Sequence, residues 1–551
     1  MRSRKITAAV LFLAFIICLF SSCTVKRVSP DSPLYVSAEA KLNFTVNIEK
    51  TGKKITNQLR LVNCWDRAGI LNDDCWDRDY IAEKIPFVET VEIMTATGGN
   101  AGLDLFKDPL DYSVRDDYDF SELILCCEKI VALDLRPSIK LANIPLKITN
   151  KPMQAGEFGV TVLPPEDINE YYDYLHACIS ALAEHFGKET VAKWRFVVFT
   201  EFDNAAWIQC TDEEFYDIYD CSVAAVESVL GKGVEIGAHA EFASPRAKGL
   251  LAHCATGTNR ITGEEGVSIS FLDFSYYTNS PYNFNTDIGD KGSTLITYAE
   301  YYGLSDLRVG VGEGRILFFE EALTSRITGK TYQAAFDTRT FIDASEEGID
   351  YVASWPAYTT RCLAEGVDNI NLINARLLFN TVGLDYIDTT RKGNMNMRER
   401  IDAFAAYDEE NETFWIGAYD MALSASYKTA KSTAFNVSLP WKEGMISVEK
   451  YVVDDSCNYF DEFRADLEEA GYTAGSPYNG GWSTWSTPNE LNPTAFNRLF
   501  VTNLEKYAPL SHDPIPTSDQ TYVTDGTLKL YHNFVPDTTV YYKVILIKDQ
   551  K

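Results

Sequence analysis

The sequence predicts an α/β protein in which a (β/α)8 TIM barrel is followed by an antiparallel β-sandwich. Two patterns lead to this expectation. Between about residues 58 and 390, short runs rich in apolar and β-branched residues alternate with longer amphipathic segments. After about residue 395, the sequence changes to strands in which polar and apolar residues alternate. A chain of 551 residues is long enough to form both units.

The barrel is predicted from eight candidate strands, the number that a TIM barrel requires. The strands are Leu59–Asn63, Thr90–Met94, Ser138–Asn143, Arg195–Thr200, Val234–Ala238, Val267–Asp273, Leu307–Gly312 and Asp350–Ser354. Two intervening helices have clear ends. We expect Gly187 to end a helix over Asp167–Phe186, and Gly348 to end a helix over Thr331–Glu347.

The sandwich is predicted from alternating strands that begin near Thr413, Thr433, Thr527 and Thr539. One further strand, Lys41–Ile48, precedes the barrel, and we expect it to complete a sheet of the sandwich. The expected domains are a signal peptide (1–22), a linker that carries this early strand (23–56), the barrel (57–392) and the sandwich (393–551).

The N-terminus predicts export. Three positive charges, Arg2, Arg4 and Lys5, precede an apolar run over Ile6–Phe20, as in a secretory signal peptide. The following Ser-Ser-Cys23 resembles the lipobox of bacterial lipoproteins, in which the Cys is lipidated. This resemblance implies a lipoprotein of the bacterial cell envelope, on the outer membrane or cell surface, that meets the membrane only through a lipid on Cys23. The alternative is an ordinary signal peptide with an incidental Cys.

Composition limits the partners. Acidic residues outnumber basic ones 79 to 50, for a formal charge of −29, which argues against nucleic acid as a partner. The aromatic share of 13% suits neutral sugars. No zinc motif occurs, and we expect neither a metal nor an organic cofactor. Most of the 12 Cys are expected to be buried, while Cys64–Cys75 and Cys210–Cys221 could form disulfides. The sequence leaves the oligomeric state open.

Two carboxylates follow predicted barrel strands, and functional residues of such barrels lie at the C-terminal strand ends. Glu201 ends the fourth strand, and Glu313 follows the seventh in what we expect to be a Gly-rich turn. Two carboxylates facing each other across a barrel are the arrangement that glycoside hydrolysis needs. The alternative is that each Glu is an ordinary polar residue that closes a strand.

Several segments are similar to motifs of one family. Trp194–Trp207 is similar to W-x-F-E-V-W-N-E-P-N…F-W, and Leu135–Pro145 to R-P-x-x-E-L-x-F-M-P. Tyr451–Tyr459 is similar to Y-x-x-D-x-x-x-S-N-x-Y. Over nearly the whole mature chain the sequence resembles the family 39 glycoside hydrolases, which include β-xylosidases and α-L-iduronidases. The resemblance implies a retaining hydrolase with Glu201 as general acid and base and Glu313 as nucleophile.

The chain also departs from that family. Thr200 stands where related enzymes carry the Asn that binds the sugar 2-hydroxyl. The candidate substrate contacts, partly taken from the resemblance, are Trp65, Thr200, Asn204, His239, Tyr276, Tyr277 and Trp355. We expect a retaining glycosidase that acts on a glycan or oligosaccharide by double displacement. The alternative, which Thr200 motivates, is a surface glycan-binding lipoprotein with weak or no catalysis.

Overall fold

The computed structural model describes most of residues 29–548. The residues that it leaves out within this range are 38–39, 48–51, 73–75, 150, 152–154, 157, 279–287, 317–321, 325–326, 329–330, 355–366, 396–398, 424–425, 472, 475–484 and 487–492. The expected signal peptide, the lipidation site Cys23 and the candidate sugar contact Trp355 lie outside the described residues.

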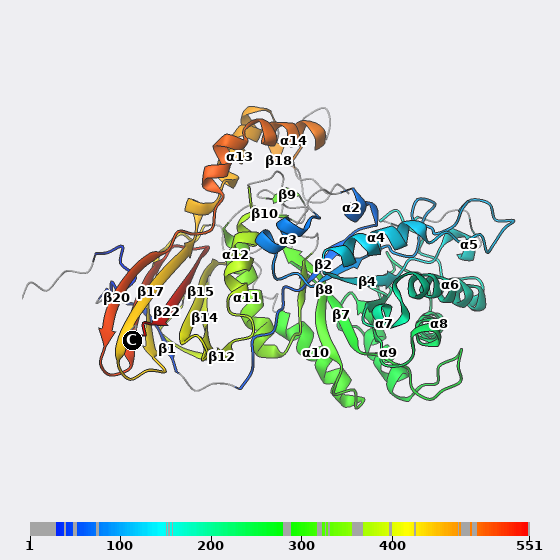
Figure 1. Ribbon diagram of the computed structural model, residues 1–551, viewed down its shortest axis with the longest axis horizontal. Helices are drawn as coiled ribbons and strands as arrows, with labels where there is room; N and C mark the ends of the chain where they lie inside the picture. The colour runs from blue at the N-terminus through cyan, green and yellow to red at the C-terminus, as the bar shows by residue number, and fades with distance from the viewer. Residues whose placement is uncertain are drawn as a thin grey trace, which may run out of the picture.

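Eight parallel strands close into a barrel, which confirms the predicted TIM barrel (Figure 1). Their order around the barrel is β11-β2-β3-β4-β5-β6-β7-β8. Each overlaps one predicted strand. The strands are β2 (Leu61–Cys64), β3 (Thr90–Ile93), β4 (Arg136–Leu141), β5 (Arg195–Val198), β6 (Glu235–Ala240), β7 (Phe271–Thr278), β8 (Arg308–Ile316) and β11 (Val352–Ser354).

Helices surround this barrel, and the two helix ends predicted from glycine are confirmed. Gly187 follows α6 with a φ of 86°, and Gly348 follows α11 in the left-handed region with a φ of 78°. The helices are α2 (Ala68–Leu71), α3 (Arg78–Lys84), α4 (Ser121–Ala132), α5 (Leu146–Thr149), α6 (Ile168–Phe186), α7 (Lys188–Val191), α8 (Asp212–Leu230), α9 (Pro245–Thr256), α10 (Ile288–Tyr301), α11 (Tyr332–Glu347) and α12 (Ile370–Phe379).

The C-terminal region forms two packed sheets, as predicted. The six-stranded sheet contains β12 (Asp385–Ile387), β14 (Glu399–Asp408), β15 (Thr413–Ala422), β22 (Thr538–Leu546), β17 (Gly444–Val453) and β20 (Thr517–Val523). The four-stranded sheet contains β13 (Thr389–Lys392), β1 (Leu42–Val46), β16 (Lys431–Ser438) and β21 (Thr527–Phe534). The early strand β1 therefore joins the sandwich as expected. It pairs antiparallel with β13 but parallel with β16, so the sandwich is not wholly antiparallel.

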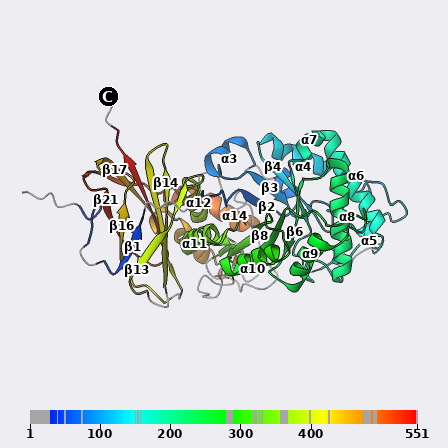
Figure 2. The same ribbon diagram turned by 90° about the horizontal axis from the view of Figure 1, so that it is seen from below.

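The barrel and the sandwich meet through α11 and α12, which lie between them in both ribbon views (Figures 1 and 2). Buried polar contacts join the two parts. The Tyr541 hydroxyl of β22 donates to Oδ1 of Asn374 at 2.8 Å and lies 3.2 Å from Oγ1 of Thr338. Because these groups are buried, their hydrogen bonds fix the sandwich against the barrel wall.

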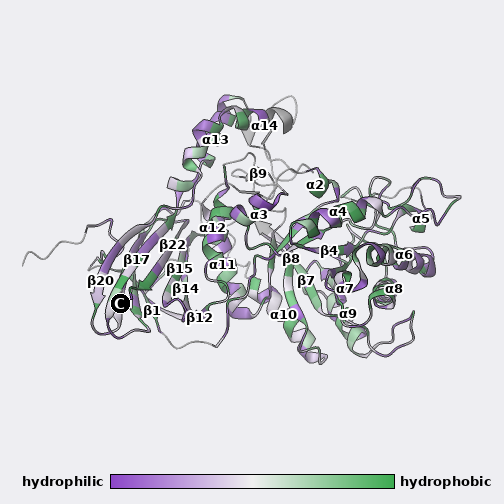
Figure 3. Ribbon diagram, viewed as in Figure 1, coloured by the Kyte–Doolittle hydropathy of each residue, from purple (hydrophilic) through white to green (hydrophobic). Residues whose placement is uncertain are grey.

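A helical insertion between β17 and β20 is a feature that the sequence did not predict. It carries α13 (Phe460–Glu469), α14 (Pro493–Thr502) and α15 (Leu504–Tyr507), with the short 3₁₀ turns η2 (Asp455–Cys457) and η3 (Ala508–Leu510). Hydrophilic and hydrophobic residues both occur along α13, whose apolar side packs on Phe500 and Tyr507 (Figure 3). Near the end of the insertion, Ser511 Oγ donates to the Asp368 carbonyl at 2.7 Å, so the insertion is anchored beside the segment that follows β11.

Most described cysteines are buried, as predicted. The possible Cys210–Cys221 disulfide is absent, because both residues are free thiols. Cys210 precedes α8 and Cys221 lies inside it, so a helical rise separates them by roughly 15 Å, too far for a disulfide. Cys75, the possible partner of Cys64, lies outside the described residues. Within the part of the chain that is described, none of the helices combines the length and apolar character needed to cross a bilayer.

Candidate active site

The two predicted carboxylates come together at the C-terminal mouth of the barrel. Glu201 follows β5 and Glu313 lies in β8, and their side chains are almost buried, with 7% and 4% exposure. A carboxylate oxygen of each and a ring nitrogen of His239 all lie within 4.8 Å of one another. The pairing expected from strand order is therefore present in the fold.

The expectation of a Gly-rich turn around Glu313 is wrong, because β8 continues as a strand to Ile316. Its register shifts beside β7, so that Phe274 pairs with Val311 and Ser275 pairs with Glu313, which leaves Gly312 as the extra residue of a bulge. A Cβ at position 312 would lie 2.8 Å from Asp273 Cβ and 3.1 Å from His239 Cδ2. Glycine there makes room for buried side chains of the barrel.

The segment that carries Glu201 has unusual backbone geometry. Phe199 and Glu201 have φ values of 66° and 40°, and non-glycine residues rarely adopt positive φ. Each such residue costs on the order of 1–3 kcal/mol, and strain of this kind concentrates at functional sites. The Phe202 amide donates to the His239 carbonyl at 3.0 Å and ties this segment to β6. Between the two strained residues, the Thr200 hydroxyl is fully buried and has no hydrogen-bond partner among the described residues.

Three donors hold the Glu201 carboxylate. Oε2 accepts hydrogen bonds from Asn204 Nδ2 at 2.9 Å and from Trp207 Nε1 at 3.0 Å. Oε1 accepts from Ser275 Oγ at 2.5 Å. Asn204, predicted as a sugar contact, thus binds Glu201. Trp207 was not among the predicted site residues, although the Trp that ends the quoted motif is the signal that could have identified it.

Ser275 connects both carboxylates to a buried His–Lys pair. Its Oγ lies 3.5 Å from Oε1 of Glu313 and 3.0 Å from Nε2 of His239. On the other side of the ring, Lys140 Nζ lies 3.0 Å from Nδ1 of His239. Burial, followed by the charges of Lys140 and Arg195, lowers the pKa of His239 well below its usual value, so the ring is neutral at physiological pH. His239 was predicted, but it lies inside β6 and not after the strand.

A layer of buried charges fills the barrel below this site. Lys140 pairs with Glu92 at 2.9 Å, and Arg195 pairs with Glu92 at 2.6 Å and with Asp273. Burial opposes the charge of Glu92, but Lys140 and Arg195 outweigh it and lower the pKa of this carboxyl. The hydroxyl of Tyr351 completes the layer through a hydrogen bond to Asp273. The site therefore rests on a fixed, paired set of charges.

The remaining predicted sugar contacts differ in their surroundings. The Trp65 ring is 6.0 Å from the Trp207 ring, which places it beside the residue that holds Glu201. Tyr276 has 2% exposure and stacks on Phe336 of α11 with 6.0 Å between ring centroids, so packing engages a face of its ring. Tyr277 is half-buried near the end of β7.

Glu201, His239 and Glu313 are also the group of described residues whose donor atoms could hold a metal ion. Both nitrogens of His239 are already engaged, Nδ1 by Lys140 and Nε2 by Ser275. A metal that bound His239 would have to break one of these contacts beside a cationic Lys, so the arrangement fits a hydrogen-bonded carboxylate pair better than a metal centre.

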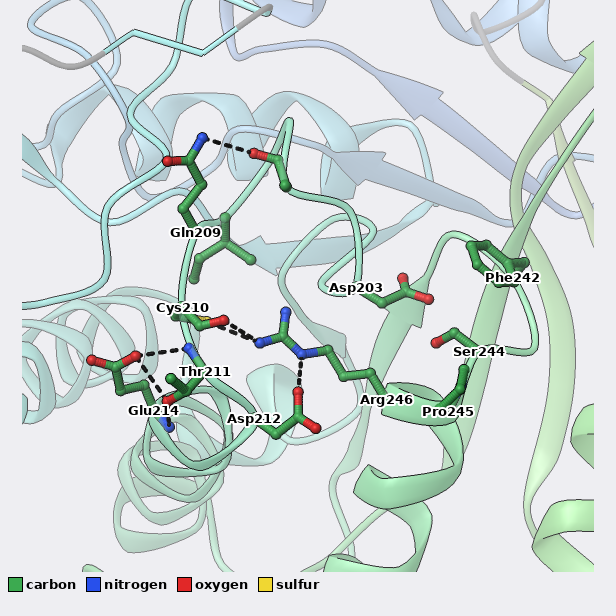
Figure 4. Close-up of a pocket in the computed structure, with 12 residues that line it drawn as sticks. Asp203, Gln209, Cys210, Thr211, Asp212, Glu214, Phe242, Ser244, Pro245 and Arg246 are labelled. Atoms are coloured by element: carbon green, nitrogen blue, oxygen red, sulfur yellow. Dashed lines mark hydrogen bonds and ion pairs between the residues drawn. The ribbon is translucent and has the colours of Figure 1, made fainter.

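An open cleft of about 780 Å³ lies between the loops that follow β5 and β6, and neither Glu201 nor Glu313 is among the residues that line it (Figure 4). The half-exposed ring of Phe242 lies on one of its walls. The Arg246 guanidinium in this cleft is held by the Asp212 carboxylate at 2.6 Å and by the Phe202 carbonyl at 2.9 Å. Nearby, burial and the charges of Glu201 and Asp203 raise the pKa of Glu241. The rim next to Glu201 is therefore acidic.

Comparison with known proteins agrees with this geometry. The family described as Glycosyl hydrolases family 39 matches residues 45–288. The β-xylosidase of Geobacillus stearothermophilus is 24% identical over 170 residues, which cover 31% of this chain and 32% of that protein. The human α-L-iduronidase is 31% identical over 116 residues, which cover 19% of this chain and 17% of that protein. The chain thus aligns with about a third or less of the length of these relatives.

The similarity in fold to solved structures extends over a longer part of the chain than the similarity in sequence. The crystal structure of the GH39 enzyme from Xanthomonas axonopodis pv. citri has a TM-score of 0.65 and 12% identity, and the match covers 93% of this chain and 98% of that one. At this identity the likeness concerns the fold, a barrel joined to a sandwich. The family match over residues 45–288 agrees with the motifs: this part of the chain is similar to the glycosyl hydrolases of family 39.

Proposed function

We propose that this protein is a retaining glycoside hydrolase that cleaves a glycan or oligosaccharide by double displacement. Glu201 is the general acid and base, and Glu313 is the nucleophile. The single observation that carries this proposal is the approach of their carboxylate oxygens to within 4.8 Å at the mouth of a TIM barrel. Retaining enzymes place the two carboxyl groups about 5–5.5 Å apart, whereas inverting enzymes need about 6.5–9.5 Å to admit a water molecule.

In the first half-reaction, a carboxylate oxygen of Glu313 attacks the anomeric carbon while the bond to the leaving oxygen breaks. Glu201 donates its proton to that oxygen. Because Oε2 of Glu201 accepts hydrogen bonds from two N–H groups, it has no room for a proton, so Oε1 carries it. The product is a glycosyl ester on Glu313.

In the second half-reaction, ionised Glu201 takes a proton from water. The water oxygen attacks the anomeric carbon, and the ester bond breaks to release the Glu313 carboxylate and a sugar of retained configuration. The buried charge layer of Glu92, Lys140, Arg195 and Asp273 keeps the pair in a fixed position during both steps.

The relatives suggest where to look for the substrate. The relatives named above are a β-xylosidase and an α-L-iduronidase, so a pentoside or a uronide is the first candidate. Trp65 offers an aromatic ring next to the acid/base for stacking on the sugar. Thr200 stays a candidate contact of a sugar hydroxyl because it stands in the place of the Asn of related enzymes, with a shorter reach; its own hydroxyl is buried and has no partner among the described residues.

The test is a screen of aryl glycosides and oligosaccharides against the wild type, Glu201→Gln and Glu313→Gln. We expect hydrolysis by the wild type and a loss of several orders of magnitude in both variants. Hydrolysis that neither substitution affects would overturn the site assignment. Binding of glycans without cleavage of any substrate would instead favour the glycan-binding alternative.

We further propose that the protein is exported and anchored by a lipid on Cys23. The charged and apolar N-terminal segments and the Ser-Ser-Cys sequence support this proposal. Expression in a bacterial host with metabolic labelling by a fatty acid tests it. Labelled wild type and unlabelled Cys23→Ser are expected, and equal labelling of both would contradict the anchor.

A further inference from the structure

We infer that Ser275 is a positioning residue whose single hydroxyl proton serves Glu201 and Glu313 in turn, and that Lys140 and His239 set the direction of its hydrogen bonds. The inference rests on the proposed function. It concerns a chain of four buried groups that runs from the charge layer to the carboxylate pair, with successive separations of 3.0, 3.0 and 2.5 Å from Lys140 to Glu201.

Lys140 determines which atoms donate and which accept in this series of hydrogen bonds. Its side chain is fully buried and paired with Glu92, whose own charge is stabilised by Lys140 and Arg195, so the amine is held as an ammonium. An ammonium can only donate hydrogen bonds. Nδ1 of His239 must therefore accept from Lys140, and the single proton of the neutral ring must lie on Nε2.

The tautomer of His239 then determines what Ser275 can do. Nε2–H donates to Ser275 Oγ, so the serine hydroxyl has no need to donate to the ring and its own proton is free to point at a carboxylate. Two carboxylate oxygens are within its reach, Glu201 Oε1 at 2.5 Å and Glu313 Oε1 at 3.5 Å. One proton can serve only one of them at a time.

This arrangement matches the two half-reactions. Before the first, Glu201 is protonated on Oε1 and Glu313 is ionised, so the serine proton belongs to Glu313. After glycosyl transfer, Glu313 is an ester and Glu201 is ionised, so the hydroxyl rotates and donates to Glu201. The donor follows the negative charge, and no proton is gained or lost by Ser275 in either step.

If these hydrogen bonds ran in the opposite direction, Ser275 could not donate to either carboxylate. If His239 carried its proton on Nδ1, Nε2 would accept from Ser275, and the serine would turn lone pairs toward both carboxylates. That arrangement requires a neutral Lys140, which deprives the buried Glu92 carboxylate of one of its two cations and leaves Arg195 as the other. Lys140 therefore acts on the site through two other residues, without touching either carboxylate.

A first experiment needs neither substrate nor activity. The full chain is labelled with ¹⁵N-histidine. Its 6 histidines give overlapping sets of signals, and those missing from the spectrum of the His239→Asn variant belong to His239. We expect a neutral ring with the proton on Nε2 from pH 5 to pH 8. A proton on Nδ1, or titration near the usual histidine pKa, would overturn the proposed direction even if the protein proves to be a glycosidase.

A second experiment tests the two-position role once a cleaved aryl glycoside is known. Glycosides with poor leaving groups report the first half-reaction, and those with very good leaving groups report the second. We expect Ser275→Ala to reduce kcat for both classes, on the order of 100-fold each, because each step loses the donor to the carboxylate that gains charge, which is Glu201 in the first step and Glu313 in the second. Ser275→Thr, which keeps the hydroxyl, should recover most of that activity.

The matched control is Ser222→Ala, which removes an equally buried hydroxyl from α8, away from the site, and should leave both rates unchanged. A loss of kcat for only one class of leaving group would contradict the proposal that the Ser275 proton serves Glu201 and Glu313 in turn. If Ser275→Ala left both rates unchanged while Glu313→Gln was inactive, Ser275 would not be a positioning residue, and the proposed function would still hold.

Discussion

The indole Nε1–H of Trp207 donates a 3.0 Å hydrogen bond to Oε2 of Glu201. The donor belongs to the same loop as its acceptor, six residues later, and its ring is stacked on Phe158 with 4.4 Å between centroids. A stacked ring has little freedom to move. Together with the hydrogen bond from Asn204, this contact occupies Oε2 of Glu201 and leaves Oε1, which faces Ser275, as the oxygen for proton transfer.

Trp207→Phe should reduce activity more than stability. Phe keeps the stacking surface but removes the donor, so one hydrogen bond to the charged form of Glu201 is lost, and kcat should fall about tenfold. Steady-state kinetics and thermal unfolding measure the two effects. Trp194→Phe, below the barrel mouth, is the control and should retain its kcat; equal losses in both variants would show a general packing effect.

Gly312→Ala should misplace Glu313. A new Cβ would lie 2.8 Å from Asp273 Cβ, so β8 must shift and carry the neighbouring Glu313 with it. We expect a loss of about 1–3 kcal/mol in unfolding free energy and at least a tenfold loss of kcat. The control is Gly69→Ala, whose Cβ would meet nothing closer than 3.6 Å. Wild-type kinetics for Gly312→Ala would contradict the role assigned to the bulge.

Arg195→Met should be strongly destabilising. The guanidinium has 2% side-chain exposure and pairs with both Glu92 and Asp273, so its removal deprives Asp273 of its ion pair and leaves Glu92 with Lys140 alone, at a cost of about 3–5 kcal/mol. Denaturant unfolding measures this cost. Lys232→Met removes the exposed pair between Lys232 and Glu264 and should cost less than about 1 kcal/mol. Similar losses in both variants would mean that the buried layer contributes no special stability.

Asp420→Asn should change how stability depends on pH. Asp420 is fully buried in β15 and its carboxyl oxygens have no partner among the described residues; burial, with the charges of Glu399 and Asp537, raises its pKa to about 8. In the unfolded chain the carboxyl titrates near its usual value of about 4. Between these values the folded state holds a proton that the unfolded state has released, so the wild type loses stability as pH rises from about 4 to about 8.

Asn cannot ionise, so the variant should match the wild type near pH 4 and exceed it by an amount that grows with pH, to on the order of 5 kcal/mol at pH 8. Denaturant unfolding at a series of pH values measures this difference. A difference that stays constant with pH would show that Asp420 does not titrate in this range.

The fold was largely predictable because hydrophobic periodicity and helix-ending glycines are local signals. All eight barrel strands overlap their predictions, but β7 begins at Phe271 and not at Val267. The whole stretch from 267 to 278 has strand character, and only its pairing with β6, Gly237 opposite Phe271, determines where the strand starts. The helical insertion was missed because its aromatic cluster joins segments that are far apart in sequence.

The site was predictable only in part. Glu201 and Glu313 follow from strand order, whereas Ser275 is an unremarkable serine until the bulge at Gly312 brings it opposite Glu313. The sequence does contain a pattern from which the buried charge layer could have been predicted. Glu92, Lys140 and Asp273 each lie within a predicted apolar strand, and charged residues in such positions need partners across the barrel. Those partners come from the closure of the barrel, which the sequence does not display.

The most direct test of the central claim is covalent trapping of the nucleophile. A 2-deoxy-2-fluoro glycoside of the cleaved sugar, with a good leaving group, should accumulate as a glycosyl ester, and mass spectrometry of the digested protein locates it. We predict one labelled site, Glu313, and no labelling of Glu313→Gln. A label on another residue, or turnover to a sugar of inverted configuration without any label, would contradict the account.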